Sequence, residues 1–206
     1  MSITLTELLA STRIHLADAQ CSESAFWDND DLTLYINEAL LSLWSLFPSD
    51  ALRNYEDVDT QNLVSGTPNY DLPTNFYIEL SVIYNDIPCR KFKYSDQAII
   101  SNNTYYKALS SQPGYTINDD DIYLFPTPSA NSTEGLEFYF LTKPPVLNGS
   151  TTSVNIDVSY SPIVSKFAAG RAVTLKESIA EGRALSQAAL EDLKLYIGKD
   201  KKEEEE

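Results

Sequence analysis

The feature that most constrains the fold is a central block of short aromatic segments set between two stretches with helical periodicity. Tyr-Asp-Leu-Pro at 70–73, Pro-Gly-Tyr at 113–115 and Leu-Phe-Pro-Thr-Pro at 124–128 lie in this block. Short aromatic and β-branched runs separated by turn residues are typical of antiparallel strands. The pattern predicts an α+β protein, in which N- and C-terminal helices form a bundle with an inserted antiparallel β module, either a sandwich or a small barrel.

The predicted domain boundaries follow the change in periodicity. We expect residues 1–61 and 159–198 to form a discontinuous helical bundle, residues 62–158 the β module, and residues 199–206 a flexible tail. The tail consists almost entirely of Lys and Glu, which is too polar to pack against a core. Cys21 and Cys89 are far apart and lack metal-ligand spacing, so they are predicted to be ordinary thiols.

The first flank carries the clearest helix signal. Aspartates between residues 28 and 31 precede apolar positions that recur at helical spacing over 32–47, and Trp44 lies on that apolar stripe. Acidic residues favour the positive end of a helix dipole, so a helix is predicted to begin here. A weaker amphipathic helix is predicted over residues 4–19.

The second flank predicts two further helices. The first covers about 161–175, because Ser161 can cap a helix and Pro162 suits its first turn. Gly182 is expected to separate it from a last helix that ends near Gly198. The apolar face of that last helix carries Leu185, Ala189, Leu193 and Tyr196.

Between the flanks, alternation predicts strands near 76–84, 89–92, 115–117, 122–125 and 136–141. The run Asn-Asp-Asp-Asp at 118–121 reads as a tight hairpin turn, since Asn and Asp tolerate left-handed backbone conformations. Residues 95–111 are predicted to include a short helix.

Composition restricts the kind of partner. The chain carries 15 Lys and Arg against 30 Asp and Glu, a formal net charge of −15. Nucleic-acid wrapping needs Lys and Arg at phosphates, so it is disfavoured. Neither a basic leader nor a membrane-length apolar run is visible, so the protein is expected to be soluble, unexported and without membrane contact.

The sequence gives little support for catalysis, a metal or a cofactor. His15 is the only histidine, and no phosphate-binding or nucleophile-elbow motif occurs. The aspartates at 28–31 lack the Gly and Glu positions of a calcium loop. At Asp119, Asp120 and Asp121 a solvated turn is favoured over a cation site or a hydrolase site, because consecutive carboxylates splay apart on an extended chain. We therefore predict a non-enzyme.

Tyrosine is abundant, at thirteen residues. Two interpretations stay open: the side chains belong to an ordinary β core and surface, or they form a protein interface, where Tyr is enriched. The strand-edge tyrosines concerned are Tyr70, Tyr77, Tyr84, Tyr115, Tyr123 and Tyr139.

Taken in order, four blocks resemble a known family: FWDNDDLTLYINEALLSLW, YDLPTNFYIELSVIYNDIP, QPGYTINDDDIYLFPTPS and LEFYFLTKPPVL, followed by an Ala-rich helical segment. The family is that of the adaptor, or head-to-tail connector, proteins of tailed bacteriophages. The residues that carry the resemblance are Trp27, Tyr35, Trp44, Tyr70, Leu72, Pro73, Gly114, Tyr115, Tyr123, Pro126, Pro128, Pro144 and Pro145.

The resemblance implies a virion protein, made in the cytoplasm of the host bacterium and placed at the neck between head and tail. It implies a ring, commonly of twelve copies, that docks on the portal protein and joins it to the tail or to a second neck protein. DNA passes through the ring without specific binding, and acidic side chains are hypothesised to ease its sliding. Family analogy suggests portal contacts at Leu185, Leu193, Tyr196, Lys201 and Lys202.

The alternative from another class is a carbohydrate- or receptor-binding β module on a helical stalk. It would use exposed Tyr77, Tyr84, Tyr115 or Trp44 as stacking platforms. Trp44 argues against it, since helical register places this residue on the buried stripe with Leu40 and Phe47.

Overall fold

The computed structural model describes residues 2–17, 26–93 and 113–203. It has the mixed α+β content that the sequence predicts. The chain divides into two compact units, a helical unit of Met1–Asn54 with Pro144–Glu206 and a β unit of Tyr55–Lys143. The chain therefore crosses between the units at residues 54–55 and 143–144, whereas the sequence pattern placed the crossings near 61 and 158.

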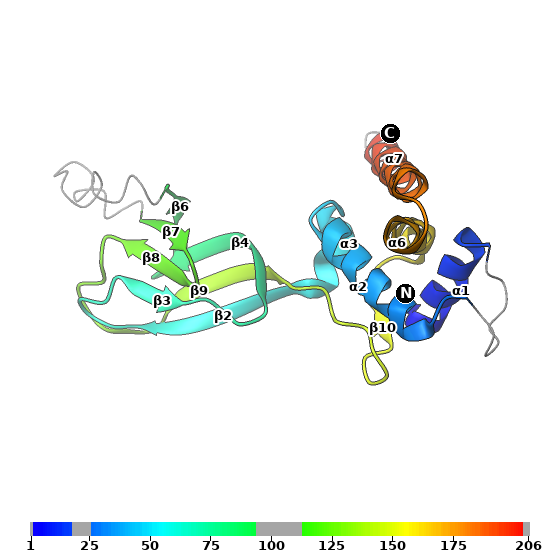
Figure 1. Cartoon of the computed structure of the whole chain (residues 1–206). Helices are drawn as coiled ribbons and strands as arrows, with labels where there is room; N and C mark the ends of the chain where they lie inside the picture. The colour runs from blue at the N-terminus through cyan, green and yellow to red at the C-terminus, as the bar shows by residue number, and fades with distance from the viewer. Residues whose placement is uncertain (1, 18–25, 94–112, 204–206) are drawn as a thin grey trace. The chain divides into compact units, whose positions relative to one another are not determined.

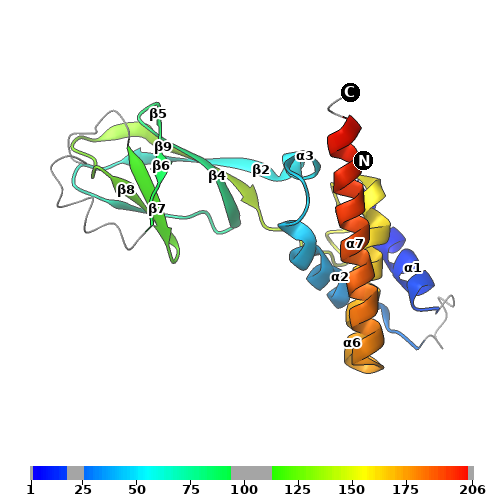
Figure 2. The same ribbon diagram turned by 90° about the horizontal axis from the view of Figure 1, so that it is seen from above.

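In the helical unit, α6 is the central helix, because it packs against α1, α2 and α7 (Figures 1 and 2). Ile3 and Val154 are opposite each other in a short antiparallel pair of strands, β1 and β10. In chain order the elements are β1 (Ile3–Thr4), α1 (Leu5–His15), α2 (Asn29–Trp44), α3 (Ser49–Leu52), η1 (Arg53–Tyr55), β10 (Ser153–Val154), η3 (Val158–Tyr160), α6 (Ser161–Lys176) and α7 (Ile179–Glu203).

Local capping explains where the first two long helices begin. At α1, the Thr4 side chain accepts a hydrogen bond from Glu7 N, and Glu7 Oε2 accepts one from Thr4 N at 2.8 Å, which forms a capping box. At α2, Asp28 Oδ1 accepts from Asp30 N at 3.0 Å, so the predicted start is confirmed. Helix α1 ends at His15, whereas the sequence pattern predicted an end at residue 19.

The C-terminal flank corrects two predictions. The break between α6 and α7 lies at Glu177 and Ser178, and Gly182 is inside α7. Helix α7 also continues through Gly198 to Glu203, so the expected tail is helical at residues 199–203. Lys and Glu are good helix formers, and an exposed glycine costs a helix only about 1 kcal/mol relative to Ala. The prediction of a flexible tail is therefore wrong for residues 199–203, whose polar side chains are compatible with a continued helix.

The β unit contains two four-stranded sheets, in the strand orders β2-β9-β4-β5 and β3-β8-β7-β6. Every neighbouring pair is antiparallel except β6 and β7, which are parallel. The strands are β2 (Glu56–Leu63), β3 (Asn69–Asp71), β4 (Phe76–Tyr84), β5 (Ile87–Pro88), β6 (Arg90–Lys91), β7 (Gly114–Asn118), β8 (Asp121–Phe125) and β9 (Ser132–Thr142).

One hydrophobic core is shared by the two sheets. Phe138 and Phe140 on β9 and Val82 on β4 meet Tyr115 on β7 and Leu124 on β8 in this core. Strands β4, β7, β8 and β9 match the predicted runs, and the 118–121 hairpin turn is confirmed by pairing at both its ends. Strand β2 was not predicted, and β3 overlaps the aromatic segment predicted at residues 70–73. The helix proposed within 95–111 lies outside the described residues.

Candidate interaction surfaces

The described residues show no group of three or more His, Cys, Asp or Glu side chains that could hold a metal ion. His15 is half-buried on α1, where burial and the neighbouring Lys166 lower its pKa. Burial raises the pKa of the Cys89 thiol to about 12, so this free thiol stays protonated at neutral pH. Cys21 lies outside the described residues.

The three consecutive aspartates, Asp119 to Asp121, lie at the turn between β7 and β8. Asp119 has the left-handed φ of 53° and accepts a hydrogen bond from Asn118 Nδ2. The carbonyl of Asp120 accepts from Leu72 N at 2.8 Å, and Asp121 Oδ2 accepts from Asn69 Nδ2 at 3.1 Å. These contacts join β8 to β3, with Asp119 and Asp121 using their carboxylates and Asp120 its backbone carbonyl.

The motif aromatics are mostly interior. In the helical unit, Trp27, Tyr35 and Trp44 are buried. In the β unit, Tyr70 and Tyr115 are buried, while Tyr77, Tyr84 and Tyr123 are half-buried. The four residues considered as stacking platforms, namely Trp44, Tyr77, Tyr84 and Tyr115, therefore form no exposed cluster.

The remaining motif residues also occupy structural positions. Gly114 begins β7, and a Cβ on it would lie 2.0 Å from Phe92 Cε2, so any larger residue would force that ring to move. Leu72 packs against the shared core of the β unit. The prolines lie in connecting segments and are buried or half-buried: Pro73, Pro126, Pro128, Pro144 and Pro145.

The residues suggested for portal contact all lie on α7. Leu193 is 2% exposed and belongs to the interior of the helical unit. Leu185 is half-buried, and so is Tyr196, whose ring meets that of Tyr160 edge-on at 5.1 Å. Lys201 and Lys202 lie in the last turns of the helix.

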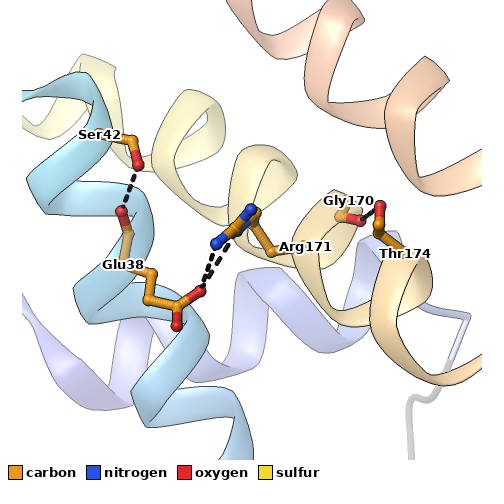
Figure 3. Close-up of polar contacts among 5 residues, drawn as sticks. All are labelled: Glu38, Ser42, Gly170, Arg171 and Thr174. Carbon is orange, nitrogen blue, oxygen red and sulfur yellow. Dashed lines mark hydrogen bonds and ion pairs between the residues drawn. The ribbon is translucent and has the colours of Figure 1, made fainter. Parts of the chain in front are cut away.

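Helices α6 and α7 approach closely, a feature that sequence reasoning missed. A Cβ on Gly182 would lie 2.4 Å from Thr174 N and 2.5 Å from Gly170 O, both backbone atoms. Figure 3 shows the Gly170 carbonyl accepting a hydrogen bond from Thr174 Oγ1, at 2.7 Å. The glycines therefore allow contact between backbones at the crossing, as small residues do in tightly packed helix pairs.

Another side of α6 contacts α2 through an ion pair. Arg171 donates to Glu38 Oε2 from Nη2 at 2.9 Å and from Nε at 3.2 Å (Figure 3). Ser42, one turn further along α2, donates its hydroxyl to the Glu38 carbonyl at 2.8 Å. Since both charged side chains are partly exposed, the pair adds orientation more than stability.

The β unit has a charge asymmetry between its strand edges. Strand β2, an edge strand, carries Glu56, Asp57 and Asp59, whereas the segment around β6 carries Arg90 and Lys91. The net charge of the chain does not reveal a local basic surface of this kind, because acidic residues elsewhere outnumber the basic ones. The positions were not singled out by any sequence motif.

Comparison with known proteins identifies the family. The family model for the SU10 adaptor protein matches residues 3–204, which include both units. A search of curated proteins gives no significant match. Among the described residues, no helix combines the length and apolar character needed to cross a membrane. The chain belongs to the SU10 adaptor protein family, and it is therefore a structural adaptor protein of a bacteriophage.

Proposed function

We propose that this protein forms an adaptor ring at the phage neck, with twelve copies, that joins the capsid portal to the tail or to a second neck protein. The observation that carries the proposal is the family match over residues 3–204. It includes the helical unit and the β unit, so neither is an addition foreign to the adaptor. A closed ring requires one face of each copy to bind a different face of the next.

The architecture supports a structural role. Each unit has its own packed interior. We propose that the helical unit is a helical bundle and that the β unit is a β sandwich. The one histidine and the one described thiol lie in settings that suit packing better than chemistry. Membership in a structural adaptor family likewise favours a protein that is not an enzyme.

Portal contact is proposed for the C-terminal part of α7. Leu195 on this helix is 66% exposed and the adjacent Tyr196 is half-buried, and Leu185, also half-buried, would extend the contact toward the start of α7. Leu193 would act indirectly, by holding α7 against the helical unit. Lys201 and Lys202 would supply positive charge near the helix end, where cations also offset the helix dipole.

Deletion of residues 199–206 tests this contact. Portal binding of the truncated protein should weaken if the last turns contribute, and full retention of binding would contradict their part. Leu195→Ala is a second probe that leaves the charge unchanged. Leu175→Ala is the matched control, because this leucine is 62% exposed but lies at the end of α6.

The acidic balance suggests how DNA passes. Carboxylates lining the axis of a ring would repel the phosphates and keep packaged DNA mobile during ejection. The net charge of −15 per copy supplies the necessary excess. A ring structure whose central surface is neutral or basic would contradict this part of the proposal.

Electron microscopy of the protein with and without its cognate portal tests the whole proposal. The expected image is a ring stacked on the narrow end of the portal, and isolated protein can remain monomeric if assembly is coupled to binding. A monomer that never binds the portal would overturn the adaptor role and would favour the alternative, a carbohydrate- or receptor-binding β module.

A further inference from the structure

The β unit has two lateral edges that differ in chemistry. Strand order places β2 and β5 at opposite edges of one sheet, and β3 and β6 at opposite edges of the other. Strands β2 and β3 lie together, because Gln61 Nε2 donates to Asp71 O at 2.8 Å and Val64 N donates to Tyr70 Oη at 3.0 Å. Strands β5 and β6 are separated in sequence only by Cys89. Figure 1 shows β2 and β3 along one margin of this unit and β6 along the other.

The first margin, called here the acidic edge, comprises β2 and β3. It carries Glu56, Asp57, Asp59 and Asp71, and residues 55–71 contain no Lys or Arg. Glu56 and Asp57 are both exposed. The acidic edge therefore concentrates negative charge on one side of the β unit.

The second margin, called here the basic edge, comprises residues 87–93. It carries Arg90, Lys91 and Lys93 and no acidic residue. Of the Lys and Arg residues described in the β unit, only Lys143 lies elsewhere. Lys91 pairs with Glu79 of β4, which leaves Arg90 and Lys93 as the exposed excess charge. Positive charge is thus gathered on one edge of a strongly acidic protein.

Strand β2 is an edge strand. Its described strand partner is β9 alone, and it already uses Val58 N for a hydrogen bond to Asp57 Oδ1 at 2.9 Å and the Gln61 side chain for one to Asp71 O of β3 at 2.8 Å. Charged residues on an edge strand discourage contact with a like-charged edge. Two acidic edges would repel each other, whereas a basic edge would be attracted. The charges therefore favour a head-to-tail arrangement over a two-fold symmetric one.

We propose that in the assembled adaptor the acidic edge of one copy binds the basic edge of the next copy. The partner is a second copy of this chain, and the contact is made by carboxylates of Glu56, Asp57 and Asp59 with Arg90 and Lys93. This inference rests on the proposed ring, and it names the surfaces through which neighbouring copies recognise each other. Repeated around an axis, the same contact uses every acidic edge and every basic edge once.

Charge reversal on portal-bound rings tests the contact. Glu56→Lys with Asp57→Lys reverses the acidic edge, and Arg90→Glu with Lys93→Glu reverses the basic edge. Each double variant should lower the yield of complete rings by about tenfold or more, because like charges would face each other. The two variants change net charge in opposite directions, so an equal loss in both cannot result from net charge. The fourfold variant restores complementarity and should recover the rings.

Zero-length cross-linking gives a direct readout. A carbodiimide joins a carboxylate to an amine only where the two touch, so rings made from mixed isotopically light and heavy copies should give cross-links between copies, from Glu56, Asp57 or Asp59 to Lys93 or Lys91. The matched control is Asp120→Lys with Lys143→Glu, which keeps net charge and alters exposed side chains outside both edges. It should leave rings and cross-links unchanged, and the melting temperature of every variant verifies folding.

The outcomes separate the two proposals. Rings that assemble normally in both double variants would overturn the edge contact and leave the adaptor role intact. Failure of the fourfold variant to recover, with folding retained, would also overturn it. If the unaltered protein never binds the portal, the proposed function falls, and the edge contact falls with it.

Discussion

The α6–α7 contact of the helical unit and the core of the β unit are packed in opposite ways. Where α6 meets α7, Gly170 lies against Ser186 and Gly182 lies against Thr174, so the two backbones come together. In the β unit the core is built from large rings, with Phe138 lying 5.4 Å from Phe76 and 5.5 Å from Phe140 between centroids. The α6–α7 contact should therefore be sensitive to added atoms, and the core of the β unit to removed ones.

Phe138→Ala should have the largest effect. This side chain is 2% exposed, and its loss leaves a cavity between the sheets, so the free energy of unfolding of the β unit should fall by about 3–5 kcal/mol. Near-UV circular dichroism in a denaturant titration measures it. Both tryptophans belong to the helical unit, so their fluorescence midpoint should move far less.

The neighbouring Tyr139→Ala is the control, because this residue lies on the same strand and is 37% exposed. Its effect should stay within about 0.5 kcal/mol. Equal losses from the two substitutions would contradict a core that depends on the inward rings.

Gly182→Ala tests the converse in the helical unit. One added methyl would collide with backbone atoms of Gly170 and Thr174, so α7 must shift, and we expect a loss of about 1–3 kcal/mol in the free energy of unfolding. Tryptophan fluorescence in a denaturant titration is the measurement. Gly198→Ala in the same helix has open space and should instead stabilise by up to about 1 kcal/mol. A neutral Gly182→Ala would show that the helices do not need this close approach.

Arg13→Met asks whether the helical unit also depends on a buried polar link. Arg13 is 4% exposed, and its Nη2 donates to Trp27 O at 2.9 Å and to Asn29 Oδ1 at 2.8 Å. Removing the guanidinium takes away the hydrogen bonds that it donates to these two acceptors, so the free energy of unfolding should fall by about 1–2 kcal/mol. The exposed Arg53→Met, which loses a pair with Asp50, should cost much less. Similar costs for both would argue against a buried link.

The smallest effect concerns pH. Burial and Lys166 lower the pKa of His15 below its ordinary value of 6.5, although Asp192 acts in the opposite direction. The unfolded chain therefore takes up a proton at a higher pH than the folded protein, and stability contributed by neutral His15 is lost as the pH falls below 6.5. Unfolding free energies measured between pH 7.5 and 5.5, at intervals of about half a unit, should fall less steeply in His15→Gln. Identical slopes would remove His15 as the cause.

Several elements could be predicted because their signals are local. Helix α2 begins at a cap that the sequence displays, and β4 begins and ends at the predicted residues 76 and 84. Strand β2 could not be predicted, because Glu-Asp-Val-Asp-Thr-Gln-Asn-Leu has almost no apolar alternation. It becomes a strand by pairing with β9, which is far away in the sequence.

Some functional features could likewise be predicted from the sequence, and others could not. The family resemblance and the absence of recognisable catalytic motifs were apparent from the order of short blocks along the chain. By contrast, the sequence pattern predicted a helix break at Gly182, because glycine is a flexible residue in a helix. The close backbone of α6, which is the reason for this glycine, can be seen only in the folded structure.

By itself, the sequence determined the α+β class, the family, the main helix starts and the aromatic strands, because caps, periodicity and turn residues act within a few positions. Only the tertiary structure decided that glycines bring α6 and α7 together and that acidic and basic residues occupy opposite edges of the β unit. These features depend on strand order and helix crossing. Both are set by contacts between segments that are distant in the chain, so no local pattern contains them.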